Sequence, residues 1–179
     1  MRLIAFAFAA ALIGAPATAS AQAGKAPPAP AAALEAFREV CVMSVDGLAP
    51  VSSLLPGRGY SRLEQPAPAL LESMPEGETR SVPARDGAVF IRPALRAEPP
   101  ADAGCAVLLQ GASGTLIADA KAMLLEGGYA VDAETGSDGA RFFAMKRRPA
   151  AGVELGAVVV EVREGGLNQV LLALVRARQ

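Results

Sequence analysis

The chain has 179 residues with 17 basic and 18 acidic side chains, a formal charge of −1, and neither histidine nor tryptophan. This length suits one ordinary domain, and the near-zero charge argues against a general nucleic-acid binder or a protein drawn to anionic membranes. The absence of histidine excludes Ser/His/Asp and Cys/His catalysis, histidine general bases and every metal site that needs an imidazole.

Residues 1–21 have the pattern of a secretory signal peptide. Arg2 precedes an apolar run over residues 3–15, and the small residues 17–21 supply a cleavage site. The run is shorter than the roughly 20 helical residues that a hydrocarbon core requires, and no cysteine lies near the cleavage region to carry a lipid. We therefore expect a periplasmic or secreted protein with no stable membrane anchor after cleavage.

The remaining chain is predicted to consist of a tether and one domain. Residues 22–33 are rich in alanine and proline and have no periodic apolar face, so we expect a disordered tether before a single domain over residues 34–179. The first helix of that domain is predicted to begin at Leu34 and to end at Asp46-Gly47. Its apolar residues recur at spacings of three and four and are expected to face the core: Leu34, Phe37, Cys41, Val45 and Leu48.

Residues 49–110 are predicted to hold loops, one hairpin and one buried strand. Prolines and glycines between residues 49 and 78 indicate a surface segment with at most a short helix over residues 69–73. Asp86-Gly87 is a typical hairpin turn, flanked by predicted strands over residues 79–83 and 88–92. After a second proline-rich loop, the apolar run 105–110 indicates a central strand buried on both faces.

The last third of the chain predicts one helix and a meander. The helix covers residues 115–126, and strands follow over residues 129–135, 140–146, 154–163 and 167–176. In the last strand pair, one apolar face is expected to combine side chains of both strands: Val158, Val160, Val162, Val170, Leu172 and Leu174. Together the elements predict an α+β fold, a single mostly antiparallel sheet with two helices packed on one face.

Cys41 and Cys105 are the two cysteines of the chain. In an exported protein, an even number of cysteines is best explained by disulfide bonding. The chain has no Cys-x-x-Cys to lower a thiol pKa and no second pair of thiol ligands, so we predict a structural disulfide rather than a redox pair or metal-bound thiols.

Residues 111–115, Gly-Ala-Ser-Gly-Thr, connect the predicted central strand to the second helix. A nucleophile elbow or a phosphate-binding loop occupies this position in other folds, but the elbow needs glycine where this chain has Thr115, and the nearest lysine, Lys121, lies well inside the helix. We predict that Ser113 caps the helix. Two alternatives stay open, a Ser113 nucleophile assisted by Lys121 and anion binding at the helix N-terminus by Gly111, Ser113, Gly114 and Thr115.

Asp132, Glu134 and Asp138 surround a glycine-rich turn and offer oxygen ligands for Ca²⁺ or paired carboxylates for glycoside hydrolysis. The spacing does not fit a calcium-binding loop, because its fifth and twelfth positions would be Gly136 and Phe143. We predict a solvated hairpin turn with no bound metal.

The run Lys146-Arg147-Arg148 is the densest group of basic residues. With Arg141 it can form a patch for an acidic partner. The alternative is a charged, solvated loop between two strands, which is the usual role of such a run.

The order of these features resembles that of small uncharacterised exported proteins of Gram-negative bacteria. The resemblance rests on the leader, the helix bearing Cys41, the hairpin over residues 82–91 and the sequence Gly104-Cys105-Ala106-Val107 before a helix. It implies export and the disulfide, and it implies no activity and no catalytic residue.

Two classes of function follow from the sequence. We favour a non-catalytic module, without catalytic residues or cofactor, that binds a periplasmic protein or a small ligand, because the core looks complete and histidine chemistry is missing. The alternative is a histidine-free hydrolase or transferase that uses either Ser113 with Lys121 or the carboxylates of Asp132, Glu134 and Asp138. That alternative predicts a concave pocket that holds those side chains with perturbed pKa values.

Overall fold

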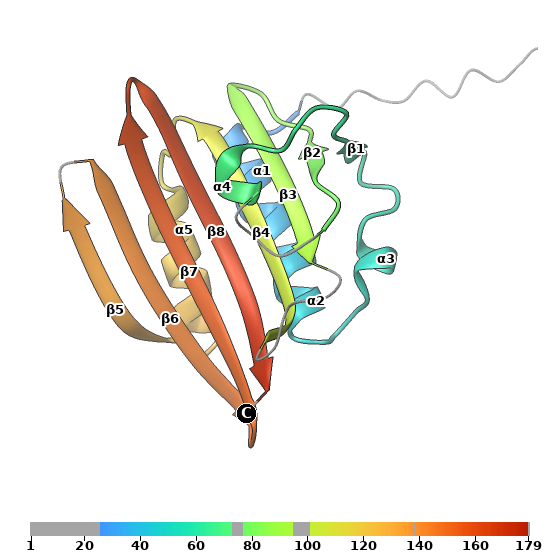
Figure 1. Cartoon of the computed structure of the whole chain (residues 1–179), viewed down its shortest axis with the longest axis vertical. Helices are drawn as coiled ribbons and strands as arrows, with labels where there is room; N and C mark the ends of the chain where they lie inside the picture. Colours follow the sequence, from blue (N-terminus) through green and yellow to red (C-terminus); the bar gives the residue numbers. More distant parts are fainter. Residues whose placement is uncertain (1–25, 73–76, 95–100, 138, 179) are drawn as a thin grey trace, which may run out of the picture.

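The computed structural model describes residues 26–72, 77–94, 101–137 and 139–178, and its main feature is one antiparallel sheet of eight strands in the order β1-β2-β3-β4-β8-β7-β6-β5 (Figure 1). The strands are β1 (Ser61–Arg62), β2 (Arg80–Val82), β3 (Gly87–Ala94), β4 (Ala101–Gly111), β5 (Ala130–Ser137), β6 (Ala140–Ala150), β7 (Val153–Glu164) and β8 (Leu167–Arg178). The helical elements are α1 (Ala29–Ala36), the π-helical segment η1 (Phe37–Val42), α2 (Met43–Val45), α3 (Val51–Leu54), α4 (Ala69–Glu72) and α5 (Leu116–Glu126). Every helix among the described residues is too short or too polar to cross a bilayer.

One face of the sheet is covered by a helical layer, as the sequence predicts. α1, η1 and α2 follow one another without a break and pack on β3 and β4, while α5 lies beside α1 and packs on β7 (Figure 1). The larger core forms between this layer and the sheet, and its largest buried side chains include Phe37, Ile91, Leu109, Leu116, Leu124, Met145, Leu172 and Leu174.

The helical layer begins earlier than the sequence predicts. Residues 29–33 belong to α1 instead of a tether, and their alanines at positions 29, 32 and 33 are buried. These small side chains let the helix approach the sheet closely, because a Cβ placed on Gly87 of β3 would lie 3.1 Å from the Cβ of Ala29. An apolar face made only of alanine is therefore a packing surface here, and residues 22–25 lie outside the described part of the chain.

Several predicted elements match the structure. β2 and β3 form the predicted hairpin, with Asp86 at a left-handed φ of 61°. β4 buries side chains on both faces, since Val107 belongs to the core under the helices and Leu108 to a second core on the other side. Leu48, in contrast, is 68% exposed instead of buried, because the helical stretch ends at Val45.

The side chains of β7 and β8 that share a face differ from the predicted set. Val160 lies opposite Leu171, and Val159 lies opposite Leu172. The two predicted apolar sets therefore occupy opposite faces: Val158, Val160 and Val162 point away from α1 and α5, whereas Val170, Leu172 and Leu174 point toward them. Both strands are apolar on both faces, so the alternation in the sequence does not determine which sets share a face.

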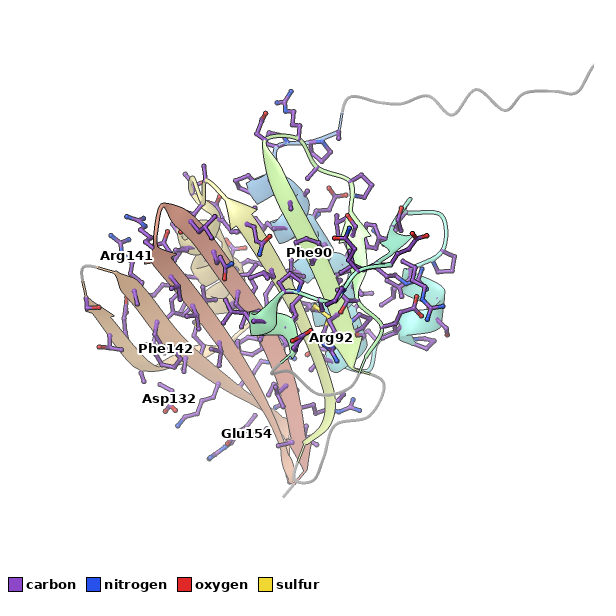
Figure 2. The ribbon with its side chains drawn as sticks, turned by 45° about the horizontal axis from the view of Figure 1, so that its top comes forward. Phe90, Arg92, Asp132, Arg141, Phe142 and Glu154 are labelled. Carbon is purple, nitrogen blue, oxygen red and sulfur yellow. A yellow bond between two sulfur atoms is a disulfide. The ribbon has the colours of Figure 1, made fainter. Side chains whose placement is uncertain are left out.

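α4 packs on the face opposite the other helices. Leu71 of this short helix is buried against Leu108 and Leu171 of the central strands, and the Arg92 guanidinium donates a hydrogen bond of 2.8 Å to the Leu71 carbonyl. Figure 2 shows Phe90 and Arg92 on this face beside α4. The predicted arrangement of two helices on one face therefore holds for the main helical layer, whereas α4 lies on the other face.

The order of the strands is symmetric about the centre of the sheet. β1 to β4 form one antiparallel meander and β5 to β8 form another, and the two meanders meet where β4 pairs with β8. The tripeptide Val-Leu-Leu occurs at residues 107–109 and again at residues 170–172. Its two copies lie opposite each other in the central pair, as Val107 with Leu172, Leu108 with Leu171, and Leu109 with Val170.

The predicted disulfide between Cys41 and Cys105 is present. Cys41 lies in η1 and Cys105 in β4, and both residues are buried. The bond therefore joins the helical layer to a central strand across the larger core.

Candidate functional site

The candidate site is a hollow of about 500 Å³ between the start of α5 and the neighbouring ends of β5, β6 and β7. Ile117 of α5 and Phe143 of β6 supply apolar lining. The ionisable and hydroxyl side chains that line the hollow are Ser113, Lys121, Glu134, Thr135, Arg141, Glu161 and Arg163. Figure 2 shows Arg141 at this end of β6.

Glu161 is the one charged residue that is fully buried among the described residues, with 1% of its surface exposed. It lies on β7 in line with Ala157 and Val159, so the alternation of the strand directs its side chain toward the helical layer. Its Oε1 atom accepts hydrogen bonds of 2.8 Å from the Ser113 hydroxyl and 2.9 Å from the Arg163 guanidinium. Its Oε2 atom lies 4.0 Å from Nε of Arg141.

Two opposing effects act on the pKa of the Glu161 carboxyl. Burial raises the pKa, because removal from water disfavours the charged form. Hydrogen bonds from Arg163, Ser113 and Asn168 to the carboxylate lower the pKa, and with the positive charge of Arg163 they outweigh burial. The pKa of Glu161 therefore lies below its usual range, and the residue is an anion at neutral pH.

Ser113 does not cap the second helix, contrary to the prediction. α5 begins at Leu116 with Thr115 as its first flanking residue, and neither side chain caps a backbone N–H of the helix. The Ser113 hydroxyl instead donates to Glu161, and the Thr115 hydroxyl contacts the Asp119 carboxylate at 2.6 Å. A buried carboxylate on another strand therefore competes for Ser113 and orients it into the hollow.

Carboxylates lie at the proposed anion site at the N-terminus of the helix. Of its residues, Gly111 ends β4, and only Ser113 and Gly114 line the hollow. The carboxylates of Asp119 and Glu161 lie against the hydroxyls of Thr115 and Ser113. Two negative charges at this terminus disfavour a further anion there.

Ser113 and Lys121 line the same hollow, as the catalytic alternative requires, but each has another partner. The Lys121 ammonium lies 2.7 Å from the Glu134 carboxylate and 5.6 Å from the centre of the Phe143 ring. A paired ammonium has no lone pair to accept a proton from Ser113. Glu161, which does accept the Ser113 hydrogen, has a lowered pKa and is therefore a weak base.

The predicted cluster of carboxylates is not brought together. Glu134 faces the helical layer and pairs with Lys121. Asp132 pairs with Lys146, which points away from the helices because its neighbours Met145 and Arg147 point toward them. Asp138 lies outside the described residues. Within the part of the chain that the structure describes, no group of three or more acidic or cysteine side chains is arranged to hold a metal ion.

The four basic residues of the proposed partner patch are also divided. Arg141 lines the hollow, and Lys146 and Arg148 form ion pairs with Asp132 and Glu154. Arg147 points under the helices, where its guanidinium contacts the Asp46 carboxylate at 2.8 Å and lies 5.1 Å from the centre of the Tyr129 ring. Burial and the nearby Asp46 carboxylate raise the pKa of Tyr129 to about 12. Arg147 thus joins α2 to β6 rather than forming one surface with its neighbours.

Sequence reasoning missed Glu161 and Arg163. Glu161 stands between Val160 and Val162, and this places it on a solvent face if the valines form the core. A signal was present, because Ala157 and Val159 make the other face of β7 apolar as well, and Glu161 continues that face. No family model, curated protein or solved structure matches this chain.

Proposed function

We propose that this chain is an exported binding module that holds an anionic group of its ligand in the hollow, at Arg141 and Arg163. Export is supported by the leader pattern of residues 1–21 and by the buried disulfide, since disulfides persist in oxidising compartments. The proposal places the protein in the periplasm or outside the cell.

The observation that carries the proposal is a pair of exposed arginines beside one buried carboxylate. The side chains of Arg141 and Arg163 are 67% and 56% exposed, whereas that of Glu161 is 2% exposed. A guanidinium carries five N–H donors, so the contacts to Glu161 leave most of them for a ligand. Guanidinium groups are well suited to carboxylates and phosphates, which they bind through paired hydrogen bonds.

The charge and shape of the hollow support the same ligand class. Its described lining holds three cationic and two anionic side chains, which leaves one positive charge in excess. Ile117 and Phe143 can contact a short apolar part of the ligand. We therefore infer a small ligand, or a segment of a partner protein, that carries a carboxylate or phosphate next to an apolar group.

The test is a titration of the ¹⁵N-labelled protein with succinate and, separately, with inorganic phosphate, followed by backbone amide shifts. We expect saturable shifts at Ser113, Gly136 and Arg163, and smaller shifts with uncharged succinamide. Replacing both arginines, Arg141→Gln with Arg163→Gln, should weaken binding at least about tenfold, because hydrogen bonds to charged groups contribute about 1.5–3 kcal/mol.

Arg148→Gln is the matched control for this experiment. Arg148 is 66% exposed and pairs with Glu154 at 2.9 Å, away from the hollow, so its removal changes the net charge without changing the site. The proposal fails if succinamide binds as well as succinate, or if the control weakens binding as much as the double variant.

A further inference from the structure

β5 is an open edge of the sheet. It is the last strand in the sheet order, and all eight of its residues are exposed. Its sequence contains neither proline nor lysine, the residues that often protect such an edge. The opposite edge, β1, has only two residues. β5 is therefore the edge with enough unpaired N–H and C=O groups to accept another strand.

The regular part of this edge lies beside the hollow. β5 is irregular between Val131 and Ala133, but from Ala133 to Ser137 it pairs with β6 residue by residue. These five residues span roughly 17 Å. Residues 134–136 also line the hollow, so a strand added along this segment would run past the mouth of the candidate site.

Gly136 leaves the Arg141 side chain accessible from this edge. The two residues lie directly opposite each other and share the face that carries the hollow. A Cβ on Gly136 would lie 3.8 Å from Cγ of Arg141, so the arginine side chain passes close to the space that Gly136 leaves free. No side chain of β5 therefore separates Arg141 from the edge at this position.

We propose that β5 accepts an extended peptide as a ninth strand, with an acidic side chain opposite Gly136 that reaches the Arg141 guanidinium. A strand added to β5 lies roughly 10 Å from β6, and an arginine and a glutamate together can span that distance. Backbone hydrogen bonds would hold the peptide, and the charge contact would select it. This inference rests on the proposed function, because it assigns an acidic peptide as the ligand of the same hollow.

Charge favours an acidic peptide at this edge. Asp132 and Glu134 of β5 are paired within the chain, with Lys146 and Lys121. The Arg141 side chain, in contrast, is 67% exposed, and its contact to Glu161 is 4.0 Å long. The charge that the edge offers a partner opposite Gly136 is therefore positive.

The first experiment selects binders from a phage-displayed library of random octapeptides and measures their affinity as blocked synthetic peptides. We expect enriched peptides to carry Asp or Glu and to bind at least about tenfold more tightly than the versions with Asn or Gln. Each selected peptide is also made in two N-methylated forms, with alternate amides blocked. Because only alternate N–H groups of an added strand point toward β5, one form should lose binding at least about tenfold and the other should retain it.

Chain variants separate the two parts of the inference. Gly136→Val suits a strand, has only ordinary contacts at its Cβ, and fills the space beside Arg141, so it should abolish the preference for the acidic peptide as Arg141→Gln does. Arg148→Gln should leave that preference unchanged. A library without enriched peptides, an equal effect of both N-methylated forms, or a preference that survives Gly136→Val would overturn the inference. Succinate binding measured in parallel shows whether the proposed function fails with it.

Discussion

At the scale of single residues, Glu161 determines how the candidate site is built. Glu161→Gln keeps the shape of the side chain and removes its charge, so Ser113 and Arg163 lose a charged acceptor. We expect the free energy of unfolding at pH 7 to fall by about 1–3 kcal/mol. The loss stays below that of a fully buried ion pair, because Arg163 and Arg141 are more than half exposed and remain solvated. Urea unfolding of both proteins measures it.

The same variant has a defined pH dependence. The pKa of Glu161 is lower in the folded chain than the unfolded value of 4.5, so its stabilisation is present above pH 4.5 and is lost as the pH falls through the folded pKa. The difference in unfolding free energy between the wild type and Glu161→Gln should therefore narrow below about pH 4.5. Glu154→Gln is the control, because this carboxylate is 32% exposed and paired with an exposed arginine. A difference that stays constant down to pH 3 would contradict the assigned role of Glu161.

The sequence did not predict which hydrogen-bond partner a polar side chain has when several partners compete for it. Ser113 precedes a helix and is therefore a reasonable cap, yet a carboxylate 48 positions away takes its hydrogen bond. Local spacing contains no information on that contact. The disulfide between Cys41 and Cys105 was predictable because the leader pattern and an even number of cysteines favour pairing.

At the scale of elements, the disulfide connects the helical layer to the sheet. Replacing Cys41 and Cys105 together by alanine opens a cross-link between residues 64 positions apart, which should cost about 2–5 kcal/mol of unfolding free energy. The measurement is the urea midpoint of the double variant, with the reduced wild type as control. The reduced wild type should also unfold at a lower urea concentration than the oxidised protein, since it too lacks the bond. A double variant as stable as the oxidised wild type would show that the bond does not stabilise the fold.

The elements themselves were largely predictable, and their faces were not. Asp86-Gly87 and the glycine-rich turns mark the strand boundaries, so the hairpin and the four-strand meander follow from local chemistry. The start of α1, residues 29–33, was missed because an alanine face has low hydrophobicity, although small side chains allow a close approach to a sheet. The predicted shared face of β7 and β8 was wrong because Val158 and Val159 are both apolar, and only the packed helices decide which one faces them.

At the scale of the whole molecule, the sheet is protected at its centre and open at one side. The central strands β4 and β8 are buried under the helical layer on one face, and under α4 on part of the other, whereas β5 has no buried residue. Each half contributes one central strand, so the two halves bury their Val-Leu-Leu segments against each other. Stability should therefore decrease from the β4–β8 pair toward β5.

Native-state hydrogen exchange tests this gradient. The amides of Val107, Leu108, Leu171 and Leu172 should exchange only through global unfolding, because both faces around them must open first. The amides of β5 should exchange fastest among the long strands, since opening this edge exposes little apolar surface. Equal protection of β5 and β4 would contradict the gradient and would imply that the edge is already covered in solution. If a bound acidic peptide pairs with β5, only the outward-pointing amides of that strand gain a new partner, so protection should rise at alternate residues between Ala133 and Ser137.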